Sequence, residues 1–130
     1  MSNNVSLLDR AKFDLKLCLK TLEDFTDDEL AKDTAAYHLA QAVEKALKFR
    51  INSFGIEYPF THRFGILIEA LEKTGDCVPQ WLINNSDTLD EYATKTRYSD
   101  SYIASGRKIL ELAEYTGELL KMYEPVLAEE

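Results

Sequence analysis

The chain has 130 residues, of which 45% are hydrophobic and 29% are charged, and its formal net charge is −8. This length and composition are typical of one globular domain, and we expect a single domain over residues 1–130 with its core at about 5–123. The negative charge disfavours non-specific binding to nucleic acid or anionic membranes, because each phosphate contact needs a cation. No apolar run approaches the ~18 residues that span a bilayer, so we expect no membrane partner and a cytoplasmic protein.

The residues that usually bind metals are few and badly spaced. Cys18 and Cys77 show neither metal-ligand spacing nor a disulfide framework. Neither His38 nor His62 is the histidine of a Glu-x-x-His pattern, which di-iron bundles use. The sequence therefore predicts no metal site and no cofactor.

The first predicted element covers residues 5–24. Its apolar residues recur in steps of three and four from Leu8 to Leu22, which predicts an amphipathic helix. The following Thr26-Asp27-Asp28-Glu29 has the pattern of a capping box, in which the Thr26 hydroxyl accepts a helical N–H and Glu29 reaches back. A second helix is therefore predicted to begin there.

This second helix is predicted to run to about Phe54 and to end at Gly55, because glycine is common just past a helix C-terminus. At 100° per residue its apolar positions form a broad arc, which indicates a central helix contacted by several neighbours. The apolar arc contains Ala36, Leu39, Ala42, Val43, Ala46, Leu47 and Phe54.

A polar stripe occupies the opposite, narrower arc of the central helix. Its members are His38, Gln41, Glu44, Lys45 and Lys48. A row of cations with an imidazole could bind a phosphate or pyrophosphate, whereas the alternative interpretation is a solvated face. Glu44 and Lys48 also stand four apart in the favourable order for an ion pair.

Arg50 projects into the apolar arc near the end of the same helix. An arginine there either binds a carboxylate or carbonyl groups, or extends its charged end into solvent. The sequence leaves both alternatives open.

Two further helices are predicted before residue 97. Thr61 is expected to cap a third helix that ends at Gly75. Pro79 suits the first turn of a fourth helix, which the run at residues 84–87 could interrupt. His62 begins the third helix beside Arg63, where free N–H groups attract anions; the alternative is that His62 only caps the helix or packs on Tyr58.

Residues 97–101 are predicted to form a helix end, a turn and a new cap, followed by a last helix over about 102–123 and a frayed end after Pro125. Arg97 stands at that helix end, where it either complements the helix dipole or binds a phosphate. No strand-like alternation occurs. We therefore expect an all-α, up-and-down bundle of four main helices plus a short extra helix, five in all.

Three motifs in this order and spacing resemble the HEPN domain family. They are Ala36-Tyr37-His38-x-x-Gln41-Ala42-x-Glu44-Lys45-Ala46-Leu47-Lys48, Gly55-Ile56-Glu57-Tyr58-Pro59-x-Thr61-His62 and Tyr92-Ala93-x-x-x-Arg97-Tyr98. The resemblance extends over roughly residues 8–123.

The resemblance implies a helical bundle like the substrate-binding subunits of nucleotidyltransferases, usually a homodimer. Members are often encoded beside a minimal nucleotidyltransferase, as a toxin–antitoxin or nucleotide-handling pair. Many members are metal-independent ribonucleases, in which an arginine is followed a few residues later by a histidine. No histidine follows Arg97 here, so the general acid or base of that motif is missing.

Two functions follow from the resemblance. The first is a binding module for a nucleotide or RNA phosphate that acts with a nucleotidyltransferase partner. The second is a ribonuclease with an atypical active site, in which His62 or His38 works with Arg97; a third, simpler alternative is a member that only pairs with its partner. Because the histidine is missing, we favour the binding module, with no assigned catalytic residue. Its expected ligand-binding residues are His38, Gln41, Lys45, Lys48, His62 and Arg97.

Overall fold

The computed structural model describes residues 5–98 and 104–128, apart from the side chains of 96–98 and 126–128. All regular elements in these ranges are helices, which confirms the predicted all-α class. The described part has six helices rather than five, because residue 85 separates a short α4 from α5. They are α1 (Leu7–Asp24), α2 (Glu29–Ser53), α3 (Phe64–Lys73), α4 (Gln80–Asn84), α5 (Ser86–Tyr98) and α6 (Gly106–Ala128).

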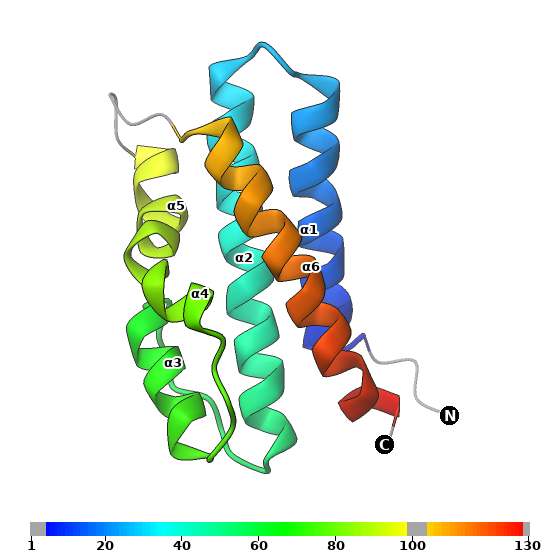
Figure 1. Ribbon diagram of the computed structural model, residues 1–130, viewed down its shortest axis with the longest axis vertical. Helices are drawn as coiled ribbons and strands as arrows, with labels where there is room; N and C mark the ends of the chain where they lie inside the picture. Colours follow the sequence, from blue (N-terminus) through cyan, green and yellow to red (C-terminus); the bar gives the residue numbers. More distant parts are fainter. Residues whose placement is uncertain (1–4, 99–103, 129–130) are drawn as a thin grey trace.

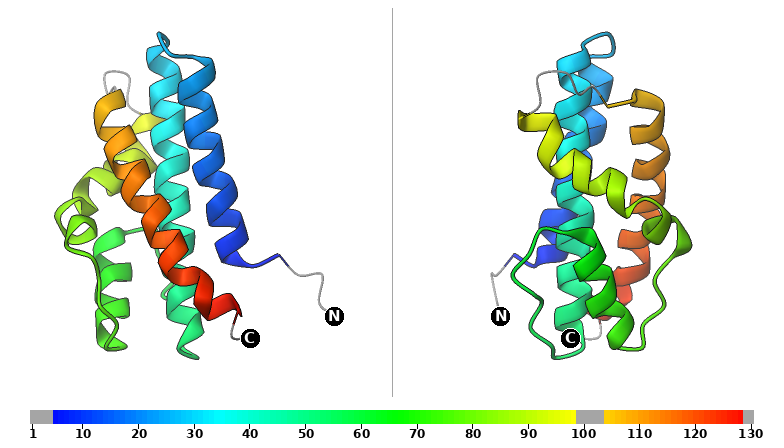
Figure 2. Two further views of the ribbon diagram at one scale, coloured as in Figure 1. Left: turned by 45° about the vertical axis from the view of Figure 1, so that its right-hand side comes forward. Right: turned by 90° about the vertical axis from the view of Figure 1, so that its left-hand side faces the viewer.

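The helix α2 is central, as predicted. It lies beside α1 in a long antiparallel hairpin, and α6 packs across both of them (Figure 1). The helices α3 and α5 pack on α2 from another side, which is clearest when the molecule is turned (Figure 2). None of the described helices is both long enough and apolar enough to cross a membrane.

Small side chains allow α2 to be contacted from several sides. Ala36, Ala42 and Ala46 are fully buried, and so are the larger Leu39 and Leu47. Alanine lets a neighbouring backbone approach closely and has the highest helix propensity. Phe54 does not belong to this core: it is the C-cap residue and is exposed, since the helix ends one residue earlier.

The helix starts differ from their predictions at two places. Asp28, not Thr26, caps α2 by accepting the N–H of Leu30 at 2.9 Å, because a turn from Phe25 to Asp28 precedes the helix. Thr61 does not cap α3 either: its hydroxyl accepts from the N–H of Arg63, before the helix begins.

The cap of α3 comes from another helix. Asp90 of α5 accepts the N–H of Phe64 through Oδ1 at 2.9 Å. This bond fixes the start of α3 against α5, and no pattern within residues 61–64 indicates it.

The helix C-termini at Gly55 and Gly75 follow the predictions. Their φ angles are +74° and +89°, the left-handed region that glycine adopts without steric cost. These two glycines direct the chain away from α2 and α3.

The last helix begins at Gly106, later than predicted. Ser105 precedes it, and the Oγ of Ser105 accepts a hydrogen bond from the N–H of Lys108 at 3.4 Å. The predicted turn and cap at residues 99–101 lie outside the described residues. The helix also continues through Pro125 to Ala128, past the predicted end at about 123, whereas the acidic end at 129–130 lies outside the described residues. A proline in the last turns removes one hydrogen bond, which the rest of this 23-residue helix tolerates.

A buried aspartate ties the segment before α6 to α2. Asp33 is 6% exposed, and its Oδ1 accepts the N–H of Ala104, which is also buried, at 2.7 Å. The bond joins residues 71 positions apart and satisfies a donor that water cannot reach.

We expect Asp33→Ala to lower the free energy of unfolding by about 1–3 kcal/mol, because it leaves the buried Ala104 N–H without an acceptor. Asp33→Asn keeps an acceptor oxygen and is expected to lose less. Urea unfolding followed by circular dichroism measures both. Equal stability of Asp33→Ala and the parent would contradict this role.

Candidate functional site

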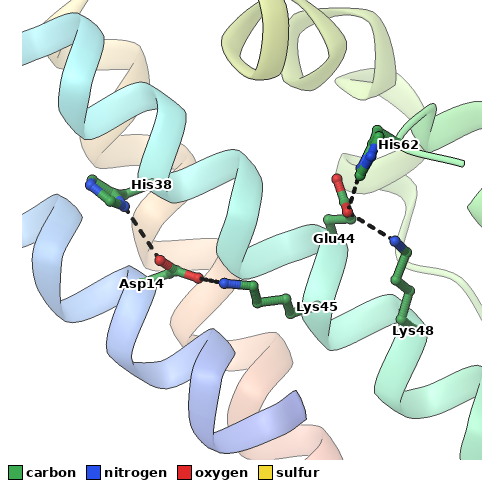
Figure 3. A network of polar contacts seen from close by, with 6 residues as sticks. All are labelled: Asp14, His38, Glu44, Lys45, Lys48 and His62. Carbon is green, nitrogen blue, oxygen red and sulfur yellow. Dashed lines mark hydrogen bonds and ion pairs between the residues drawn. The ribbon is translucent and has the colours of Figure 1, made fainter.

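Two buried carboxylates organise the polar face of α2, each with two nitrogen-bearing side chains around it (Figure 3). Asp14 of α1 is contacted by His38 and Lys45, and Glu44 of α2 is contacted by Lys48 and His62. The stripe seen in the sequence is therefore divided between two clusters that lie on different sides of α2.

In the first cluster, Asp14 is 6% exposed and both of its oxygens are paired. Its Oδ1 lies 3.3 Å from Nδ1 of His38, and its Oδ2 forms a short contact with Nζ of Lys45. Asp14 was not among the site residues predicted from the sequence. A signal existed, since Asp14 stands three after Ala11 and four before Cys18, on the apolar face of α1.

Burial of Asp14 opposes its ionisation, but the hydrogen bonds and positive charge of His38 and Lys45 outweigh burial and lower the pKa of the carboxyl below its ordinary 3.8. Asp14 is thus a fixed anion at neutral pH. It neutralises much of the positive charge that the sequence assigned to this part of the stripe.

In the second cluster, Glu44 is 4% exposed, although its place in the sequence puts it on the polar arc. Its Oε2 lies 3.0 Å from Nζ of Lys48 and 2.9 Å from Nδ1 of His62. The first distance confirms the predicted ion pair. Because a carboxylate can only accept, Nδ1 of His62 carries the proton. The ammonium of Lys48 also lies 5.0 Å from the centre of the Tyr58 ring.

The two carboxylates differ in how completely they are satisfied. Glu44 Oε1 is buried and has no hydrogen-bond partner among the described residues, whereas both oxygens of Asp14 have one. An unsatisfied buried polar atom costs roughly 1–3 kcal/mol.

The histidine of the second cluster is open to solvent. The His62 side chain is 80% exposed, although its Nδ1 is held on Glu44. Its other ring nitrogen therefore points away from the carboxylate, and the next residue, Arg63, is exposed at the start of α3. Gln41 is half-buried on α2 between the turns that carry His38 and Lys45.

Arg97 lies on the last turn of α5, and its side chain is outside those described. The helix α5 meets the start of α3 at Asp90, seven residues earlier, which is about 10 Å along the helix axis. The backbone of α5 thus carries Arg97 well past the start of α3 near which His62 lies.

Arg50 binds a carboxylate, one of the two alternatives from the sequence. Its Nε and Nη2 lie 2.8 Å and 3.2 Å from the two oxygens of Asp76. Its guanidinium also lies 4.8 Å and 5.4 Å from the ring centres of Phe54 and Tyr123. Burial, and then the charge of Asp76, raise the pKa of the Tyr123 hydroxyl. This cluster joins α2, the segment after α3, and α6.

Within the part of the chain that the structure describes, no three His, Cys, Asp or Glu side chains converge to hold a metal ion. The thiol of Cys18 is buried, and this burial raises its pKa to about 12.

The family model described as HEPN domain matches residues 5–126. This chain belongs to the HEPN domain family. No curated protein and no solved structure matches it in comparable searches. The three motifs that carried the resemblance contain the residues of the Glu44 cluster, the His38 and Lys45 partners of Asp14, and Arg97 of α5. HEPN domains are often associated with ribonuclease and toxin–antitoxin roles.

We expect Asp14→Asn to destabilise the protein by about 1–2 kcal/mol at pH 7, because charged hydrogen bonds to His38 and Lys45 are lost. A lowered pKa in the folded state adds stability above pH 3.8 that disappears as the pH falls through the folded value. The difference between parent and variant should therefore shrink below about pH 4.

Urea unfolding of both proteins between pH 2.5 and pH 7 measures this difference. The exposed Asp24, paired with Lys20 on α1, provides the control Asp24→Asn, which should change stability little at any pH. A gap between parent and Asp14→Asn that stays constant to low pH would contradict the role given to Asp14.

Proposed function

We propose that this HEPN-domain protein is a nucleotide-binding module that acts with a nucleotidyltransferase partner, as one half of a toxin–antitoxin or nucleotide-handling pair. Its phosphate site lies at the start of α3, around His62, Arg63 and Lys48. Membership of the HEPN family supports the partnership and a homodimeric state. The arrangement around Glu44 supports the site.

The single observation that carries the choice of site is the incomplete satisfaction of Glu44. Glu44 Oε1 is buried without a partner among the described side chains, and a buried polar atom left unpaired in a folded protein requires an explanation, which a bound ligand would supply. Asp14 shows no such deficit, since His38 and Lys45 pair both of its oxygens. A nucleotide carries hydroxyl and amino groups as well as phosphates. Those hydroxyl and amino groups are the kind of hydrogen-bond donor that Glu44 lacks.

The start of α3 adds the features that an anion requires. The first N–H groups of a helix have no partner within the helix, and Asp90 accepts only that of Phe64. A Cβ added at Gly65 would meet no neighbouring atom within 4 Å, so no other element covers the helix at this position. His62 and Arg63 stand beside these N–H groups, and both are exposed.

Glu44 has a positioning role in this proposal. It accepts from Nδ1 of His62 and so directs the other ring nitrogen outward, towards a ligand. It also holds Lys48 against Tyr58. Of the other expected ligand residues, Arg97 is retained because it belongs to the third motif shared with HEPN domains. Gln41, His38 and Lys45 stand on the turns of α2 nearer to Asp14 and would contribute less.

Isothermal calorimetry with ATP and with inorganic phosphate tests the proposal. We expect His62→Ala and Arg63→Ala each to weaken ATP binding about tenfold, which corresponds to about 1.4 kcal/mol. His38→Ala is the matched control, because it removes the other histidine, which is paired with Asp14. ATP binding that is absent, or that His38→Ala weakens more than His62→Ala, would overturn this site.

The ribonuclease alternative has one structural observation in its favour. A carboxylate that accepts from one nitrogen of an exposed histidine is the arrangement that orients a general base, and Glu44 and His62 have it. A partner for His62 in phosphate chemistry would have to come from Arg97 or from a second subunit.

Cleavage of a structured RNA by rigorously purified protein separates the two functions. We expect no cleavage above that of a mock purification, because the histidine of the HEPN ribonuclease motif is missing after Arg97. Cleavage that His62→Ala and Arg97→Ala both abolish, and that His38→Ala leaves intact, would instead establish the ribonuclease.

A further inference from the structure

A groove of about 460 Å³ runs between α1 and α6, on helices that carry none of the residues of the α3 phosphate site. Its lining residues recur on each helix in steps of three and four, so each helix contributes one continuous face. The lining comprises Lys12, Leu15, Lys16, Leu19, Lys20 and Glu23 of α1, and Gly117, Leu120, Lys121 and Glu124 of α6.

The floor of the groove is apolar and is deepened by a glycine. Leu15, Leu19 and Leu120 supply its hydrocarbon surface, and Leu19 is 42% exposed. At Gly117 an added Cβ would lie 3.9 Å from Cδ2 of Leu15, an ordinary contact distance. The absence of a side chain at this position leaves room for another element to approach the α1–α6 seam.

The rim of the groove is basic in an acidic protein. Four lysines and two glutamates line it, a net charge of +2, whereas the whole chain carries −8. Lys12, Lys16 and Lys20 stand four residues apart along one edge of α1, and Lys121 stands on α6. The described residues provide no ion pair for Lys16 or Lys121.

The remaining two lysines have exchangeable partners. Lys12 lies 2.7 Å from Glu124, and Lys20 lies 3.3 Å from Asp24, with all four side chains at least 40% exposed. Such exposed ion pairs contribute little to stability and readily give way to a competing carboxylate.

We propose that the α1–α6 groove binds an acidic amphipathic helix of a partner protein. Leucine-type side chains of that helix would cover Leu15, Leu19 and the gap at Gly117. Lysines four residues apart recur about every 6 Å along α1, and carboxylates four residues apart on a helix recur at the same interval. Charge complementarity along such a row favours an acidic helix.

The same charges disfavour a second copy of this chain as the occupant. Two-fold pairing through one groove would bring together two identical surfaces that each carry a net charge of +2. The groove shares no residue with the nucleotide site, so a helix can bind there whether or not ATP binds at α3.

Fluorescence anisotropy with a labelled synthetic helix of about four turns tests the proposal. The probe carries leucine on one face and glutamate at four-residue spacing on its flanks; a matched peptide carries glutamine in place of glutamate. We expect the glutamate peptide to bind at least tenfold more tightly than the glutamine peptide. Its affinity should fall as salt rises.

Two variants remove different parts of the groove. The double variant Lys16→Glu, Lys121→Glu reverses two charges without breaking an ion pair. The variant Gly117→Leu fills the floor of the groove, and leucine has a higher helix propensity than glycine. Each of the two variants should bind the glutamate peptide at least tenfold more weakly than the parent does. The control Lys73→Glu, on α3, should change binding less than twofold.

Circular dichroism first establishes that each variant is folded. The proposal is overturned if the glutamate peptide does not bind, if the glutamine peptide binds equally well, or if both groove variants bind like the parent. Sedimentation adds a further decisive outcome, because a homodimer that dissociates only in Gly117→Leu would identify a second copy as the occupant. Co-sedimentation of the parent, but not of Lys16→Glu, Lys121→Glu, with phosphatidylglycerol vesicles, while the glutamate peptide does not bind, would identify a lipid surface instead.

Discussion

The structure depends on a central helix that is packed from more than one side and still carries charge. Alanines let α1, α3, α5 and α6 pack on α2, and this packing buries positions that a more exposed helix would leave in water. Glu44 is buried for this reason, and Asp14 is buried where α1 packs on the same helix. A buried carboxylate is tolerated only with cations or hydrogen-bond donors around it. The histidine and lysines of α2, and His62 before α3, are therefore held as partners of these two carboxylates.

The helices were largely predictable because their signals are local. Apolar steps of three and four define α1 and α2, and glycines with positive φ stand where both α2 and α3 end. Starts were less predictable, since competing caps stand close together: Asp28 replaces Thr26, and the cap of α3 is Asp90, 26 residues away. A cap supplied by another helix is a tertiary contact, and helix periodicity contains no information about it.

The candidate site was only half predictable, for the same reason. The sequence identified the cations of α2 as one row, which was either an anion site or a solvated face, and it identified His62 separately at the start of the next helix. The Glu44–Lys48 pair was predictable from its spacing on α2, but the carboxylates that His38, Lys45 and His62 meet depend on how α1 and the segment before α3 pack on α2. Asp14 could have been noticed as an acidic residue on the apolar face of α1, whereas the burial of Glu44 follows only from the position of neighbouring helices.

The pairing changes what the positive charges can do. A row of unpaired lysines would attract any polyanion, but each cluster here contains its own anion, and the chain as a whole carries −8. Attraction at long range is therefore weak, and binding must come from groups placed at short range. This favours a small ligand held by an oriented histidine, an arginine and helix N–H groups over a long nucleic acid held by phosphate contacts, whose affinity grows with the number of unpaired cations along the strand. The same reasoning separates the two surfaces of the molecule: the start of α3 offers directed donors for one anionic group, whereas the α1–α6 groove combines apolar area with a regular row of lysines, which suits an extended partner.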